Sequence, residues 1–286
     1  MNRTKPMPQD IKRVFWKKGA CSSTFFYILN REFGHLKDTE ERAAEPFAGG
    51  IMQKGHQCGM LWGSAMAVGA ESYRRQKGND DPGQAIAMAI TATQHLMESF
   101  EKRTQSVNCK DVTGCDFSIK FEMAKFMLKS FLFIFFDSSC FKLAEKWAPE
   151  AILSATEGLA GEQTDLPKQS ISCASEVAKK MGATEEEMLM VAGFAGGLGL
   201  SGNACGALSA AIWMNTLNWF KKQEKTPKDA YLNSKAKDTL NAFNDETGSE
   251  ILCHKITGRR FETIDDHTEF IKNGGCEKLI NVLAQS

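Results

Sequence analysis

"FAGGIMQKGHQCG" occupies residues Phe47–Gly59, and "FAGGLGLSGNACG" occupies residues Phe194–Gly206. The two phrases begin 147 residues apart and are identical at seven of thirteen positions. A match this specific, repeated within one chain, is the signature of an internal duplication. In each phrase the glycines are expected to end one helix and turn the chain, and the small residues that follow are expected to begin the next helix.

Four cysteines recur in the same order in both halves of the chain. The corresponding pairs are Cys21 with Cys173, Cys58 with Cys205, Cys109 with Cys253, and Cys140 with Cys276. The ninth cysteine, Cys115, stands where the second half has Arg259, so we expect it to be dispensable. A polar stretch at Gly158–Ser170 separates the halves. We therefore predict two four-cysteine repeats, at residues 1–158 and 159–286.

The hydrophobic pattern indicates an all-α protein. Apolar residues recur at helical spacing in most segments, while alternating runs rich in Val, Ile and Thr are scarce. Pro82 is placed to begin a long helix, and Thr184 with Glu187 three residues later predicts a capping box. The predicted fold is a tandem pseudo-symmetric duplication of a helical domain of roughly 140 residues.

The composition narrows the function. The chain has 286 residues, of which 42 % are hydrophobic and 24 % are charged, with a formal net charge of zero. This balance argues against a nucleic-acid partner, which would favour a basic excess. The longest apolar run, residues 126–136, is too short to span a bilayer and predicts a buried core helix. The basic residues near the N-terminus precede no apolar run, so no signal peptide is expected.

Nine cysteines without an export signal predict a cytoplasmic, reducing location, where such a chain more often binds metal or is redox-active than holds structural disulfides. No CxxC motif occurs, which argues against a thioredoxin motif or a zinc ribbon. The five histidines have no matched partners between the halves and predict no site.

Cys58 and Cys205 are the predicted redox-active thiols. Each follows a glycine turn and falls at the start of a helix, where exposed N–H groups and the helix dipole are expected to lower the pKa of the thiol. The neighbouring glycines predicted to contact a cofactor are Gly55, Gly59, Gly202 and Gly206. A buried, purely structural role for the cysteines is the alternative, although four of them recurring in order argues against it.

The cysteine order and the Cys-Gly after a glycine turn resemble the C_GCAxxG_C_C family of redox-active proteins. The first copy reads Cys58-Gly59-Met60-Leu61-Trp62-Gly63, with Met in place of Ala. The second reads Cys205-Gly206-Ala207-Leu208-Ser209-Ala210, with Ala in place of the last Gly. The resemblance covers nearly the whole chain as two tandem copies, and it implies a redox role.

Two redox hypotheses use the same residues. In the first, each half holds an iron–sulfur cluster or another metal centre for electron transfer, and the ligands are Cys21, Cys58, Cys109, Cys140, Cys173, Cys205, Cys253 and Cys276. In the second, the thiols exchange disulfides with a redox partner protein. The third hypothesis is that the protein is a non-redox helical scaffold or interaction protein. A homo-oligomer is compatible with all three, and the sequence leaves open whether the chain is an enzyme.

Overall fold

The computed structural model describes residues 8–78, 82–119, 121–124, 139–160, 167–223, 230 and 233–286. The apolar run at residues 126–136, with the core helix predicted for it, lies outside the described residues. So does part of the stretch that separates the halves. Over the described ranges the chain is helical and has no strand, which confirms the all-α class. Extended pairing is limited there to two isolated bridges, Gln57 with Asn108 and Ala204 with Leu252.

The helices of the two halves follow one another in the same order. In the first half these are α2 (Cys21–Phe33), α3 (Asp38–Ala43), η1 (Glu45–Phe47), α4 (Gly59–Gln76), α5 (Pro82–Thr104), α6 (Cys109–Thr113) and α8 (Ser139–Gly158). Their counterparts are α9 (Cys173–Lys180), α10 (Glu185–Met190), η3 (Ala192–Phe194), α11 (Gly206–Lys221), α12 (Ser234–Thr247), α13 (Cys253–Ile256) and α15 (Glu277–Gln285). Neither α1 (Pro8–Lys18) nor α14 (Ile264–Lys272) has a described counterpart.

The two glycine phrases have the same secondary structure. Each begins at the end of a short 3-10 helix, continues through a turn to an isolated bridge, and ends at the first residue of a long helix, α4 or α11. The packing also repeats, because α2 lies on α4 as α9 lies on α11, and α4 lies on α5 as α11 lies on α12. These equivalences confirm the tandem duplication.

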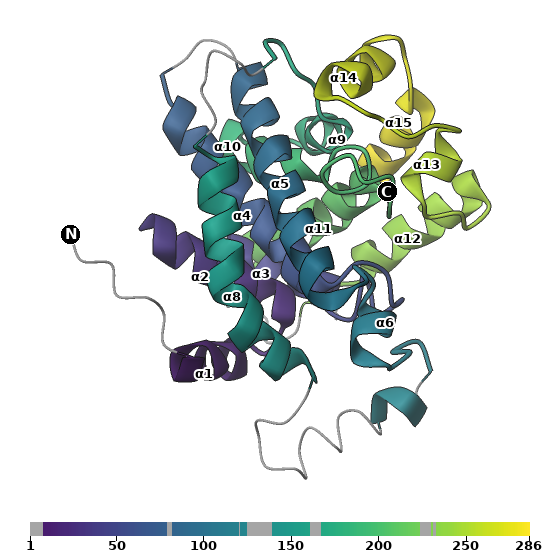
Figure 1. Ribbon diagram of the computed structural model, residues 1–286. Coiled ribbons are helices and arrows are strands. Elements are labelled where there is room, and N and C mark those ends of the chain that lie inside the picture. Colours follow the sequence, from purple (N-terminus) through teal and green to yellow (C-terminus); the bar gives the residue numbers. More distant parts are fainter. Residues whose placement is uncertain are drawn as a thin grey trace.

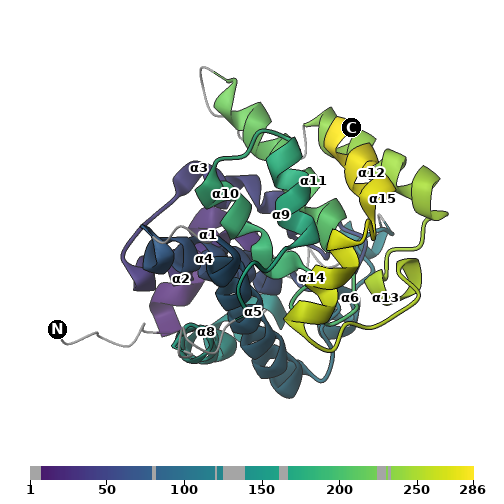
Figure 2. The ribbon, with the colours of Figure 1, turned by 90° about the horizontal axis from the view of Figure 1, so that it is seen from above.

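The contacts between the halves are reciprocal. α4 of the first half packs on α10 of the second, and α11 of the second half packs on α3 of the first. The outer helices lie on opposite sides of the molecule, with α1, α2 and α8 on one side and α12 to α15 on the other (Figure 1 and Figure 2). The glycine phrases that carry Cys58 and Cys205 therefore come from two segments packed against one another.

The larger of two hydrophobic clusters among the described residues runs through both halves and includes a group of contacting aromatic rings. Phe47, Trp62 and Phe194 are fully buried. The ring of Trp62 stacks on Phe47 at 5.4 Å and meets Phe194 edge to face at 4.8 Å. Burial of one such side chain contributes about 1.5–3 kcal/mol relative to leaving it exposed. The shared core fixes the two glycine turns relative to each other.

The predicted helix starts are confirmed, while the predicted end of the helix before the second glycine turn is wrong. α5 begins at Pro82, and Thr184 and Glu187 form the predicted capping box at the start of α10. α10 ends at Met190, earlier than the paired glycines Gly196 and Gly197, because a 3-10 turn intervenes. Among the described helices, none is long and apolar enough to cross a membrane.

Candidate redox site

The eight paired cysteines lie at the beginnings of helices. Cys21, Cys109, Cys173 and Cys253 are the first residues of α2, α6, α9 and α13. Cys58, Cys205 and Cys276 are the N-cap residues of α4, α11 and α15, and Cys140 is the second described residue of α8. The backbone N–H groups of a first helical turn have no partner within the helix, so a sulfur placed there has donors close by.

The glycine turn has an unusual backbone. Five consecutive residues, 49–53, have positive φ angles, and the equivalent residues 196–200 do as well. A Cβ atom on Gly50 would lie 2.4 Å from the carbonyl oxygen of His56, and one on Gly197 would lie 2.6 Å from the backbone nitrogen of Asn203. Only glycine allows the chain to fold back on itself this closely.

The turn then places each Cys-Gly against the loop that carries the next cysteine. In the first half, the backbone N–H of Cys58 donates to the carbonyl oxygen of Val107 at 2.8 Å, and the N–H of Cys109 donates to the carbonyl oxygen of His56 at 2.7 Å. The second half repeats this pattern. There the N–H of Cys205 donates to Ile251 at 2.8 Å, and that of Cys253 donates to Asn203 at 2.6 Å. Two cysteines distant in sequence are thereby held together in each half.

In the first half the Cys58 thiol is the largest influence on the pKa of Cys21, through hydrogen bonding to the Cys21 sulfur. This bond lowers the pKa of Cys21 although burial opposes it, and the backbone N–H of Gly49 lowers it further. The pKa of Cys58 is raised well above its ordinary value, first by the same hydrogen bond and then by burial and the nearby thiols, including Cys109 and Cys140. The four thiols affect one another's pKa values, and we call them the first cluster; Cys21 is the member whose pKa is lowered.

The second cluster consists of Cys173, Cys205, Cys253 and Cys276. These four residues line a single small cavity of about 10 Å³, room for about one water molecule. Burial raises the pKa of all four, that of Cys276 to about 12. The N–H of Gly196 lowers the pKa of Cys173 as that of Gly49 does for Cys21, but no thiol donates to Cys173. The clusters therefore gather within each half and differ in their hydrogen bonding.

A family comparison follows the same division of the chain. The family model described as "Putative redox-active protein (C_GCAxxG_C_C)" matches residues 20–148 and again residues 169–286. The chain belongs to this family. It carries two tandem copies of the family's domain, as its cysteine order predicted. Comparison with curated proteins and with solved structures finds no match.

The expected lowering of the pKa at Cys58 and Cys205 is wrong. Both residues do lie at helix N-termini, and the N–H groups of Leu208 and Ala207 lower the pKa of Cys205. Burial outweighs this effect at Cys205, and at Cys58 the donated hydrogen bond holds the proton on sulfur. The thiol with the lowered pKa is Cys21, which no feature of the sequence distinguished from the other cysteines.

Cys115 lies beside the first cluster. It is 6 % exposed, and it raises the pKa of both Cys109 and Cys140 after the larger effects of burial and of Cys21. Comparison of the repeats could not reveal this position, because its counterpart is Arg259. The first family domain thus carries five neighbouring thiols and the second carries four.

The four glycines predicted to contact a cofactor touch protein atoms. A Cβ atom on Gly59 would lie 2.6 Å from the sulfur of Cys21, and one on Gly206 would lie 1.9 Å from the carbonyl oxygen of Phe194. Gly55 packs on Lys110, and Gly202 packs on Arg260 and His254. Gly59 has a definite role, because its missing side chain lets Cys21 approach Cys58. A contact with a cofactor stays a prediction for all four.

The described side chains do not form a metal site as they stand. Across the ranges described, no three Cys, His, Asp or Glu side chains converge closely enough to hold one metal ion. The eight cysteines remain ligands by prediction. All nine are free thiols in the structure.

His267 lies beside the second cluster, and the sequence did not single it out. It is 1 % exposed, lines the same cavity as the four cysteines, and has its Nδ1 3.2 Å from the carbonyl oxygen of Ile171. Burial lowers its pKa to about 4, so the ring is neutral. In the sequence His267 stands three residues after Ile264 and four before Ile271, the spacing of one helix face. That spacing indicates a buried position and does not indicate a functional site.

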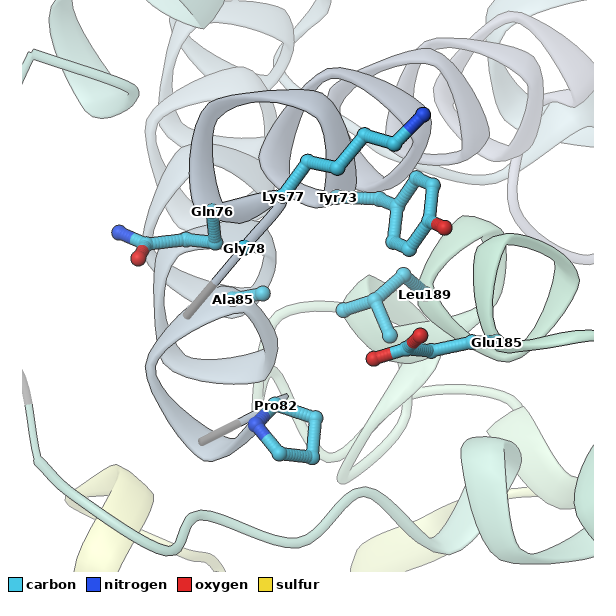
Figure 3. A pocket seen from close by; sticks show the side chains of 8 residues that line it. All are labelled: Tyr73, Gln76, Lys77, Gly78, Pro82, Ala85, Glu185 and Leu189. Atoms are coloured by element: carbon cyan, nitrogen blue, oxygen red, sulfur yellow. The ribbon is translucent and has the colours of Figure 1, made fainter. Parts of the chain in front are cut away.

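A further cavity, of about 70 Å³, lies where the end of α4 meets the start of α5 and α10. Figure 3 shows its lining, which includes Tyr73, Lys77 and Glu185 around Leu189. No cysteine lines it, so it contributes no thiol to either cluster.

Proposed function

We propose that this member of the redox-active family performs thiol–disulfide exchange through Cys21 and Cys58. The observation that carries the proposal is the close approach of the Cys21 sulfur to the Cys58–Gly59 step, where a Cβ atom on Gly59 would lie 2.6 Å from it, together with the lowered pKa of Cys21. A nucleophilic thiol with a second thiol in contact is what exchange requires. Their contact also supports closure of an intramolecular disulfide between two helix starts, at Cys21 and Cys58.

The proposed reaction oxidises this pair and reduces a disulfide of a partner protein. The Cys21 thiolate attacks one partner sulfur and forms a mixed disulfide, and the other partner sulfur leaves as a thiolate. The Cys58 thiol passes its proton to that leaving thiolate. The sulfur of Cys58 then attacks Cys21, forms the Cys21–Cys58 disulfide and releases the second partner sulfur, which takes up a proton from solvent. Two electrons pass to the partner, and the reverse sequence returns them.

A metal or iron–sulfur centre is the second candidate. It is favoured by one observation, that the four cysteines of the second cluster line a common cavity. A bound centre there would supply one-electron transfer, with Cys173, Cys205, Cys253 and Cys276 as the ligands. The described arrangement does not fit an ion, since no three ligands converge on one point, and no step of the exchange chemistry uses one.

The remaining parts of the proposal follow from the thiols. Free cysteines favour a reducing, cytoplasmic location, and the exchange reaction needs a redox partner protein. A homo-oligomer is compatible with the proposal and is not required by it.

Protein purified without oxygen tests the proposal against the second candidate. We expect colourless protein with little iron or zinc, in which mild oxidation removes two thiols and peptide mapping finds the Cys21–Cys58 disulfide. A visible absorbance shoulder with stoichiometric iron that is lost in Cys205→Ser would favour the metal centre instead. If all nine thiols were unreactive and no metal were bound, the result would favour the hypothesis of a non-redox scaffold protein.

A further inference from the structure

A polar groove lies between α5 and the glycine turn of the second half. Its volume is about 580 Å³, within the range of small-molecule sites. Its lining comes from α5, from the loop before Cys109, and from three residues of the second glycine phrase with Arg260. It therefore brings together parts of both halves.

One wall of the groove carries two carboxylates. Gln94, Met97, Glu98 and Glu101 line it at helical spacing, so they share one face of α5. Both glutamates are exposed, and among the described residues neither has an ion-pair or hydrogen-bond partner. The wall therefore presents unneutralised negative charge next to the apolar side chain of Met97.

The part of the lining that comes from the second half carries a guanidinium group, that of Arg260. One N–H of Arg260 donates to the carbonyl oxygen of Ser201 at 2.9 Å, which anchors the side chain along the turn. Its other N–H groups pair with no carboxylate in the described part of the chain. The groove thus carries charges of both signs, and none of these three side chains forms an ion pair with a described residue.

We infer that this groove binds a small zwitterionic molecule, such as a short peptide with free ends. The ammonium group lies against Glu98 and Glu101, and the carboxylate lies on Arg260. A guanidinium suits a carboxylate because its paired N–H groups match the two oxygens. Each charged group of the ligand gains a partner that the folded chain leaves unsatisfied.

The groove adjoins the backbone that positions both clusters. Val107 and Asn203 line it, and their carbonyl oxygens accept from the N–H groups of Cys58 and Cys253 respectively. The ligand itself needs no thiol, so the inference stands apart from the proposed exchange reaction. It can fail while the Cys21–Cys58 disulfide still forms, and the reverse is also true.

Calorimetric titration with trialanine tests the inference, because this tripeptide carries both charges and has no reactive sulfur. We expect saturable binding by the full-length reduced protein. N-acetyl-trialanine lacks the ammonium and trialanine amide lacks the carboxylate, and each should bind about tenfold more weakly, as expected for loss of one charged hydrogen-bond partner.

Single and double variants test which side chains bind the carboxylate and the ammonium group of the ligand. Arg260→Gln should weaken trialanine about tenfold and abolish the preference for trialanine over its amide. Glu98→Gln with Glu101→Gln should abolish the preference over the acetylated form. Glu269→Gln and Lys272→Gln, exposed charges on α14, are the matched controls and should bind as the unaltered protein does. No binding of trialanine, or equal binding by all variants, would overturn the inference.

Discussion

Phe47 and Phe194, which occupy equivalent positions in the two halves, meet edge to face with ring centroids 5.7 Å apart and an interplanar angle of 88°. Each ring ends the short 3-10 helix before a glycine turn. The turns of both cysteine clusters therefore start from one aromatic contact. The larger hydrophobic cluster of the chain therefore contains residues of both family domains.

Phe194→Ala should destabilise the whole molecule. The ring is fully buried and touches both Phe47 and Trp62, so its removal leaves a cavity between the halves. We expect the free energy of unfolding in urea to fall by about 3–5 kcal/mol. Phe121→Ala is the control, since that ring is 77 % exposed and its loss should change the value by no more than about 0.5 kcal/mol. Equal effects would contradict a shared core.

Cys58→Ala should slow the reaction of Cys21. The substitution removes the thiol that donates to the Cys21 sulfur, so the pKa of Cys21 should rise and less thiolate should be present at neutral pH. The measurement is the rate of methylthiolation by a small reagent as a function of pH, with peptide mapping. We expect the midpoint for Cys21 to move to higher pH.

The controls for this experiment come from the same chain. Cys21→Ser should abolish the fast phase. Cys173→Ser should preserve it, because no thiol donates to Cys173 and burial raises its pKa. Cys115→Ser should also preserve it, since Cys115 acts on Cys109 and Cys140 rather than on Cys21. A fast phase that disappears in Cys115→Ser would refute the assignment of Cys21.

The sequence predicted the framework of the site but not its chemistry. Matching residues such as Phe47 and Phe194 indicated the duplication. The glycines that precede Cys58 and Cys205 predicted the turns and the starts of the helices that follow. The order of the pKa values depends on burial and on which sulfur donates to which. Those quantities follow from tertiary packing, and a helix-dipole argument applied to Cys58 alone could not include them.

Comparison of the two halves also missed site residues that have no counterpart in the other half. Cys115 and His267 lie at the two clusters, but neither is repeated in the other half. A comparison between halves detects only what duplication preserved. Features acquired by one half became visible when the chain was folded.

His267→Asn should flatten the acid side of the stability curve. The pKa of His267 falls from an ordinary 6.5 to about 4 on burial, so the folded state resists protonation that the unfolded state accepts. Stability from this group is present above pH 6.5 and is lost as the pH falls toward 4, by about 3 kcal/mol. The free energy of unfolding at pH 7 and pH 4 should show a smaller difference in His267→Asn than in the unaltered protein. Equal differences would show that burial does not govern this ring.

Gly59→Ala and Gly206→Ala should fail in different ways, although the two glycines are equivalent. A Cβ atom on Gly59 would lie 2.6 Å from the Cys21 sulfur, an atom that can turn away about its side-chain bond, and 3.0 Å from the carbonyl oxygen of Phe47, a smaller backbone clash than the one at Gly206. A Cβ atom on Gly206 would lie 1.9 Å from the carbonyl oxygen of Phe194, which is backbone and cannot turn away.

We therefore expect Gly59→Ala to fold but to lose the hydrogen bond between Cys58 and Cys21. The reaction rate of the Cys21 thiol should fall, and the rate of disulfide formation by Cys21 should fall about tenfold or more because the contact with Cys58 is lost. Gly206→Ala should instead lose several kcal/mol of stability and leave the reactivity of Cys21 unchanged in the molecules that fold. Gly34→Ala is a control for both, since a Cβ atom there meets nothing within 4 Å, although its φ of +87° adds some strain. If Gly59→Ala retains the rapid reaction and the disulfide, the Cys21–Cys58 contact is not the basis of the redox chemistry.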